Sequence, residues 1–173
     1  MQYGNLNKNL QCIMSKIVQS DDLLKFLFYK DMGEGVASLS NVSGKDKVGM
    51  ITGKTQQIFP YKKIPQSREE FQCYISMEYG AVNRETRGRG SKYFKYPSFF
   101  IYILVSQTLD STPNGSRLLA IEQCIEDTFH GKQIDAISMC YLGNSTPIDC
   151  PNGYLGRAIP LIFVDTNEVS LNG

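Results

Sequence analysis

Hydrophobic residues recur at helical spacing in the first part of the chain. The apolar side of the first predicted helix is formed by Leu6, Leu10, Ile13 and Ile17. A second helix is predicted within SDDLLKFLFYKD (20–31). There Ser20 or Asp21 is the N-cap, and acidic residues occupy the first turn, which the helix dipole favours.

A third helical pattern lies in the second half of the chain. Thr112 and Pro113 resemble a helix start, because proline is tolerated in the first turn of a helix. Gly131 is a suitable residue just beyond a helix end. The apolar side of this predicted helix is formed by Leu118, Ile121, Ile125 and Phe129.

Four segments have the hydrophobic patterns of strands. FQCYISMEY (71–79) and IDAISMCYL (134–142) alternate between the two faces, and the first of them is predicted to be a half-buried strand. SFFIYILVSQTL (98–109) is apolar on both faces over most of its length and is predicted to be a central strand. AIPLIFVD (158–165) is the last, and Pro160 predicts that this strand lies at a sheet edge or carries a bulge.

The order of these elements predicts an α+β fold in a single domain spanning 1–173. We expect a small, mostly antiparallel sheet of about four strands flanked by helices. Residues 33–57 contain five glycines and little periodicity, so a long flexible Gly-rich loop is expected there, with a short strand allowed at 48–51. Residues 80–97 lie between two predicted strands and are expected to form a long projecting β-hairpin.

Composition narrows the classes of function. Of the 173 residues, 42% are hydrophobic and 20% are charged, which is typical of a globular protein rather than a disordered one. The formal net charge is +1, so any electrostatic function must be local. The N-terminal residues lack the pattern of a signal peptide, and the longest apolar stretch, 99–105, is too short to cross a bilayer. We therefore expect synthesis in a cytosol and no membrane partner.

Few residues are of the kinds that usually carry chemistry. The five cysteines are scattered and form no CxxC pair, so buried thiols are expected. GMITGKT (49–55) resembles a phosphate loop, but it has three residues instead of four between its glycines, and prolines follow where a helix is needed. His130 is the single histidine, and Cys124 falls on nearly the opposite side of the same predicted helix. We expect no catalytic residue, no cofactor and no metal site, and thus no enzyme.

The predicted hairpin carries the strongest local charge. Arginines that bind phosphate and aromatic rings that stack on bases are typical of RNA binding. However, a nucleic-acid-binding domain usually presents an extended basic face, whereas this nearly neutral domain has one short basic patch. A mobile tip kept soluble by its charges and a contact surface of an assembly are the other two interpretations. The candidate contact residues, interleaved with aromatic residues, are Arg84, Arg87, Arg89, Lys92 and Lys95.

Several segments follow one another in a characteristic order between residues 20 and 165. They are DDLLKFLFY, IFPYKKIPQS leading into QCYISMEYG, FFIYILVSQT, SRLLAIEQCIEDTF, IDAISMCYL and GYLGRAIPLIFVD. In this layout the chain resembles the tail terminator family of tailed bacteriophages, also called tail-completion or head–tail joining proteins. The segment 33–57 has no counterpart in the resemblance.

The resemblance implies a structural virion protein located in the phage tail or neck after synthesis in the host cytoplasm. Copies are expected to form a ring, a hexamer in this family, that terminates the tail tube and provides the docking surface for the head connector. The implied partners are other copies of the chain, the tail tube protein, a connector or stopper protein and, transiently, passing DNA. The alternatives are another neck or tail adaptor, such as a stopper or a baseplate-proximal ring, and a cytosolic nucleic-acid-binding domain that uses residues 84–95.

Overall fold

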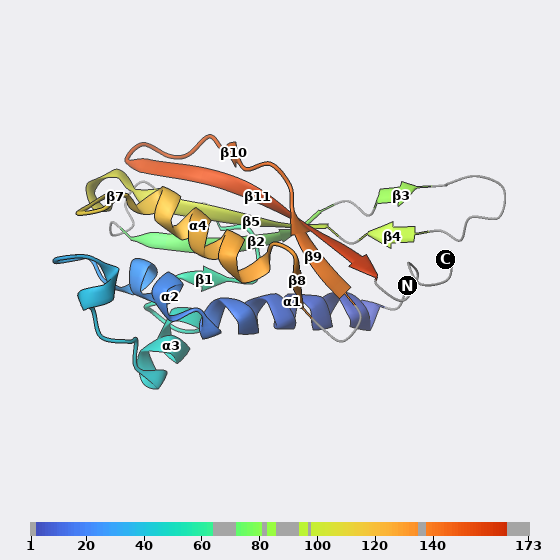
Figure 1. The fold of residues 1–173 in the computed structure, drawn as a ribbon, viewed down its shortest axis with the longest axis horizontal. Coiled ribbons are helices and arrows are strands. Elements are labelled where there is room, and N and C mark those ends of the chain that lie inside the picture. Colours follow the sequence, from blue (N-terminus) through green and yellow to red (C-terminus); the bar gives the residue numbers. More distant parts are fainter. Residues whose placement is uncertain are drawn as a thin grey trace.

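A computed structural model describes residues 3–63, 72–80, 83–85, 94–96, 98–134 and 138–165. Its main sheet carries helices on one face (Figure 1). The α-helices are α1 (Tyr3–Gln19), α2 (Asp21–Phe28), α3 (Gly44–Ile51) and α4 (Arg117–Phe129). The strands of the main sheet are β1 (Ile58–Phe59), β2 (Cys73–Tyr79), β5 (Ser98–Ser106), β8 (Lys132–Gln133), β9 (Ser138–Leu142), β10 (Thr146–Pro147) and β11 (Tyr154–Asp165).

The strand order in the main sheet is β1-β2-β5-β11-β9-β8, and β10 also pairs with β11. Every pairing is antiparallel except that of β1 with β2. The α+β class is therefore confirmed, and β5 is central as predicted. Seven strands rather than about four form the sheet in the described residues, because the two-residue strands β1, β8 and β10 extend the four predicted ones.

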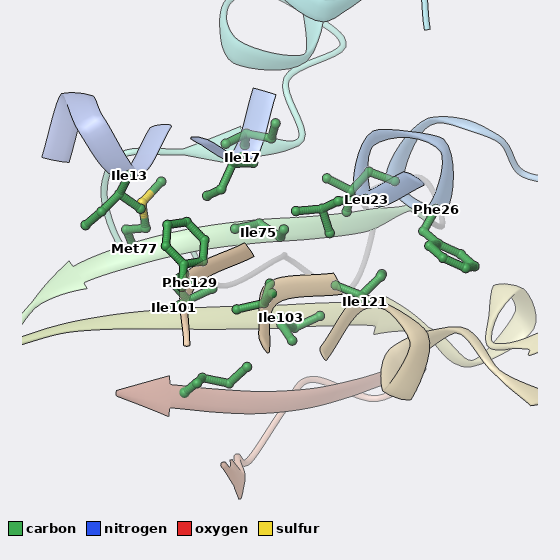
Figure 2. Close-up of a cluster of buried hydrophobic side chains, with 14 of the residues drawn as sticks. Ile13, Ile17, Leu23, Phe26, Ile75, Met77, Ile101, Ile103, Ile121 and Phe129 are labelled. Carbon is green, nitrogen blue, oxygen red and sulfur yellow. The ribbon is translucent and has the colours of Figure 1, made fainter. Parts of the chain in front are cut away.

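The helix-covered face of the sheet holds the main hydrophobic core (Figure 2). Alternate residues of the strands point toward α1, α2 and α4, whose apolar sides meet them there. Burying one large aliphatic side chain in this way contributes about 1.5–3 kcal/mol. The labelled core residues in Figure 2 are Ile13, Ile17, Leu23, Phe26, Ile75, Met77, Ile101, Ile103, Ile121 and Phe129.

The helix α4 begins later than predicted. Thr112 and Pro113 belong to a tight hairpin, and Ser116 is the N-cap, whose hydroxyl accepts a hydrogen bond from the amide of Leu119 at 3.3 Å. The carboxylate of Asp110 also accepts from the Ser116 hydroxyl at 3.0 Å. Because these groups satisfy the helix N-terminus at Ser116, the helix does not extend back to the proline. The hairpin consists of β6 (Ser111–Thr112) and β7 (Gly115–Ser116).

The segment 33–57 contains regular structure that the sequence reading did not predict. A short 3-10 helix (Val36–Ser38) and α3 lie within it, and the strand allowed at 48–51 is wrong because those residues form the second half of α3. The hydroxyl of Ser43 accepts from the amide of Asp46 at 3.2 Å and donates to the Asp46 carboxylate at 2.6 Å. This S-x-x-D cap starts the helix despite the neighbouring glycines.

The strand β11 lies inside the sheet, between β5 and β9, so the edge position predicted from Pro160 is wrong. Ala158 pairs with Thr146 of β10, whereas Leu161 pairs with Leu142 of β9. Three steps along β11 thus correspond to four along its partners, so the extra residue lies between β9 and β10. The strand β11 itself pairs with β5 without interruption from Tyr154 to Ile162 and does not carry the predicted bulge. Pro160 falls where the ladder to β9 and β10 is interrupted, so its missing N–H costs little.

The face opposite the helices, called here the open face, carries a smaller aromatic core. Tyr74 and Ser76 of β2 are buried on this side, so the prediction that β2 is half-buried is wrong. A side chain at Gly156 would collide with Cys150 and Ile148, so the segment that contains them lies directly on the strands. The residues of the open-face core are Phe59, Tyr74, Tyr102, Leu104, Tyr154 and Ala158.

Candidate assembly surfaces

The hairpin β3–β4 continues the pair β2–β5 past the end of the main sheet (Figure 1). Its strands are β3 (Asn83–Glu85) and β4 (Phe94–Tyr96), and they form a separate antiparallel pair. The hairpin predicted for 80–97 is therefore present in the described residues 83–85 and 94–96. Arg84 and Lys95 occupy facing positions in the register. The other three candidate cations, Arg87, Arg89 and Lys92, lie outside the described residues.

A charged group lies beside the aromatic core of the open face. The hydroxyl of Tyr102 donates to Oε2 of Glu78 at 2.5 Å, and Nζ of Lys62 lies 3.2 Å from the same oxygen. Nζ of Lys62 is also 4.7 Å from the centre of the Tyr102 ring, and Nζ of Lys63 is 4.9 Å from that of Phe59. The electron-rich faces of these aromatic rings attract the two ammonium groups and hold them on the open face.

The hydrogen bonds in this charged group shift the pKa of each member. The bond from Tyr102, followed by the bond from Lys62, holds the pKa of Glu78 below its usual range. The bond to Glu78 raises the pKa of Lys62, and burial followed by the bond to Glu78 raises that of Tyr102. The side chains of Lys62 and Glu78 are each 42% exposed, so the group remains accessible to a partner.

An apolar groove runs between α1 and α3. Its volume is about 520 Å³, and among the described residues no charged side chain lines it. The polar lining residues are Gln11, Ser15 and Gln19 of α1. Its apolar lining residues are Leu10, Met14 and Val18 of α1, Ile51 of α3 and Pro60. We call this surface the α1–α3 groove. A groove of this kind favours a partner with an apolar side chain.

The solvent side of α4 forms a ridge with one apolar, one amide and two acidic side chains. Leu119 is 56% exposed near the start of the helix. Gln123, Glu126 and Asp127 are exposed on the same side, at spacings of about one and two helical turns from it. We call these four residues the α4 ridge. The ridge carries two carboxylates and no cation.

Charge is divided between the two halves of the chain, a signal that the sequence reading missed because it considered only the total. Residues 1–97 contain 15 lysines and arginines against 9 acidic residues, which gives +6. Residues 98–173 contain 3 against 8, which gives −5, and the two halves together give the net charge of +1. The α1–α3 groove belongs to the positive half and the α4 ridge to the negative half. A count by segment would have found this asymmetry.

The residues that could carry chemistry are held apart or buried. Burial raises the pKa of the Cys73 thiol to about 11 and that of Cys140 to about 12, so neither is a nucleophile at neutral pH. Nδ1 of His130 accepts from the amide of Leu142 at 3.3 Å, and its ring packs edge-on against Tyr141. In the part of the chain that the structure describes, no group of three His, Cys, Asp or Glu side chains could hold a metal ion.

Within the same residues, none of the helices combines the length and the apolar character needed to cross a bilayer. The described residues form a small α+β domain with a hairpin that extends past its main sheet and an apolar groove along α1. The chain belongs to the YomW family, whose model matches residues 20–163. YomW is a phage-associated family, so the phage origin implied by the resemblance is supported. No curated protein matches the chain.

Proposed function

We propose that this protein is a structural subunit of a phage virion, located in the tail or neck, that works by binding alone. Copies join into a ring, expected to be a hexamer, on the last ring of the tail tube. One side of the ring fits the tube protein and stops its growth. The opposite side does not template another tube subunit and instead docks the head connector or stopper protein.

The observation that carries this proposal is the β3–β4 hairpin, which extends beyond the main sheet of a phage-associated protein (Figure 1). A two-stranded ribbon outside a sheet is marginally stable by itself in water. A neighbouring subunit that packs along it would stabilise it, as expected for an element that joins subunits. The sheet also has short strands at both edges, which leaves little edge for uncontrolled growth.

The cationic residues of the hairpin add a role for passing DNA. Five cations in each of six copies would place about thirty positive charges around a channel. Contacts to phosphate that do not read bases would let DNA slide through the ring. A ring would thus gather the positive charges of all its copies around the channel, whereas a single copy carries only five of them.

The test is the assembly state of the full chain, alone and mixed with purified tail tubes of its phage. Native mass spectrometry and negative-stain images are expected to show closed rings, in solution or on tube ends. Replacing Arg84, Arg87 and Arg89 with alanine is expected to leave the circular dichroism spectrum unchanged and to weaken ring formation or DNA contact. A chain that stays monomeric in both settings overturns the proposal. Rings that bind the connector or baseplate but not tube ends identify another neck or tail adaptor.

A nucleic-acid-binding domain is the second candidate, and the basic residues between 84 and 95 favour it. In this case the monomer binds single-stranded RNA, and the affinity falls steeply as salt rises. The triple alanine variant then loses RNA affinity while its assembly state does not change. If the variant alters neither assembly nor nucleic-acid binding, the cations serve only to keep the hairpin soluble.

A further inference from the structure

We propose that the α1–α3 groove receives the α4 ridge of a second copy, so that copies of the chain join head to tail. The inference rests on the self-assembly proposed above and names the two surfaces that make the contact. It concerns surfaces described by the structure and does not depend on the basic hairpin.

The groove is suited to an apolar side chain on a helix. Leu10, Met14 and Val18 are spaced by one turn, so they form a line along α1. Ile51 and Pro60 complete the apolar part of the lining, beside which lie the polar residues Gln11, Ser15 and Gln19. Water in an apolar groove is readily displaced, because covering such a surface is favourable. The volume of about 520 Å³ accommodates several side chains.

The α4 ridge has the complementary form. Leu119 is an apolar side chain that is 56% exposed on a helix whose other large apolar residues face the core. Gln123 follows it one turn later, and its amide donates to Asp127 at 3.0 Å. The ridge therefore offers one apolar side chain followed by acidic groups along one side of a helix, and the groove lining likewise follows one side of α1.

The exposed charged residues that lie near the two surfaces along the chain are opposite in sign. Lys8 is exposed on α1, one turn before Gln11 of the groove lining, and Lys54 is exposed three residues after Ile51. Glu126 and Asp127 are exposed on the ridge. Two grooves or two ridges brought together would repel each other, whereas a groove and a ridge attract. The contact is therefore expected between different surfaces.

The two surfaces lie on different parts of the molecule. In Figure 1, α3 and the neighbouring part of α1 form the lower border, whereas α4 lies higher, across the strands. Each copy therefore keeps one free groove or ridge after pairing once. A contact of this heterologous type repeats until it closes into a ring or continues as a filament.

The test uses two pairs of charge reversals in the full chain. Lys8→Glu with Lys54→Glu makes both surfaces negative, and Glu126→Lys with Asp127→Lys makes both positive. Each variant alone is expected to weaken self-association at least about tenfold, because like charges then face each other. An equimolar mixture is expected to regain association as alternating copies, since both kinds of contact are then complementary. Sedimentation velocity and native mass spectrometry measure this, and circular dichroism checks the fold of each variant.

Matched controls separate position from charge. Lys45→Glu and Asp149→Lys alter exposed residues of the same two halves that belong neither to the groove lining nor to the ridge, and are expected to leave association unchanged. Leu119→Asn is expected to weaken association, whereas Val48→Asn, at a 61% exposed residue outside the groove lining, is not.

The outcomes distinguish this inference from the proposed function. If the wild-type chain does not associate with itself, alone or on tube ends, both are overturned. If it forms rings and the two reversal variants form them equally well, only the placement of the contact is overturned. The pairing is also wrong if both variants are folded and monomeric but their mixture does not associate.

Discussion

The two faces of the sheet are built from the same strands but are covered in different ways. On the helix-covered face, aliphatic side chains such as Ile101 and Ile159 are almost fully buried under helices. On the open face, irregular segments and lysines cover aromatic rings, and Ile162 and Tyr141 remain 39% and 42% exposed. The helix-covered face therefore holds the main core of the fold, while the open face leaves more side-chain surface accessible for contacts.

A matched pair of truncations on β11 should give the largest difference between the faces. Ile159→Ala, at a residue 2% exposed on the helix-covered face, is expected to lower the free energy of unfolding by about 2–5 kcal/mol. Ile162→Ala, three residues later on the open face, is expected to cost less than about 1 kcal/mol. Urea denaturation of both variants measures this. Equal costs would contradict the comparison.

The buried guanidinium of Arg117 should produce the next largest effect. Its Nη1 donates to the carbonyl of Tyr29 at 2.7 Å and its Nη2 to that of Lys30 at 2.9 Å, just past the end of α2. Arg117→Leu leaves these carbonyls without their donor and is expected to cost at least about 2 kcal/mol. Arg117→Lys keeps the charge but not the planar fork, and thermal unfolding is expected to place it between wild type and Arg117→Leu. A Lys variant as stable as wild type would show that the charge alone matters.

Gly156→Ala should separate the covering segment from the open face. The added methyl group meets Sγ of Cys150 and the side chain of Ile148, so overpacking is expected to cost about 1–3 kcal/mol. Displacing this segment also removes the burial that raises the pKa of Cys150, so its thiol should react faster with a disulfide reagent near pH 8. Gly44→Ala is the control, because nothing lies within 4 Å of the added atom. An unchanged rate at Cys150 would argue against the close packing.

The smallest effect is expected at the exposed charged group of the open face. Because the pKa of Glu78 is lower in the folded chain, the native state binds fewer protons than the unfolded state just below the ordinary value of 4.5. The stabilisation is therefore present above pH 4.5 and is lost as pH falls through the lower folded pKa. Glu78→Gln is expected to cost less than about 1 kcal/mol near neutral pH, since the group is 42% exposed. Denaturation midpoints should differ at pH 7 and converge at low pH; a constant difference would exclude the linkage.

The sequence predicted the main helices and strands well, but it predicted helix boundaries and the short elements between them poorly. The four long strands and the apolar sides of α1 and α4 follow from periods of about two and about 3.6 residues, which are local properties. The start of α4 was misplaced because Pro113 resembles a helix start in isolation, whereas Asp110 and Ser116 cap the helix further along. The helix α3 had a readable capping signal at Ser43 and Asp46, but the glycines around it led to a prediction of a loop.

The candidate surfaces also differ in whether they could be predicted from the sequence. The basic hairpin could be predicted, because its cations are adjacent in the sequence and lie between two strong strand patterns. The α1–α3 groove could not, because Val18, Ile51 and Pro60 become neighbours only when distant segments pack together. The α4 ridge was partly readable from its helical spacing, although its contact role depends on the charge of the rest of the molecule.

Local patterns in the sequence specified α1, α2, α4 and the four long strands, together with the apolar sides of α1 and α4, because those preferences act between residues a few positions apart. Only the packing of the whole chain places β11 inside the sheet and buries a second, aromatic core on the open face beneath an irregular segment. The reason is physical: neighbours in the folded sheet are chosen by the burial of the whole core, and no local pattern encodes that choice.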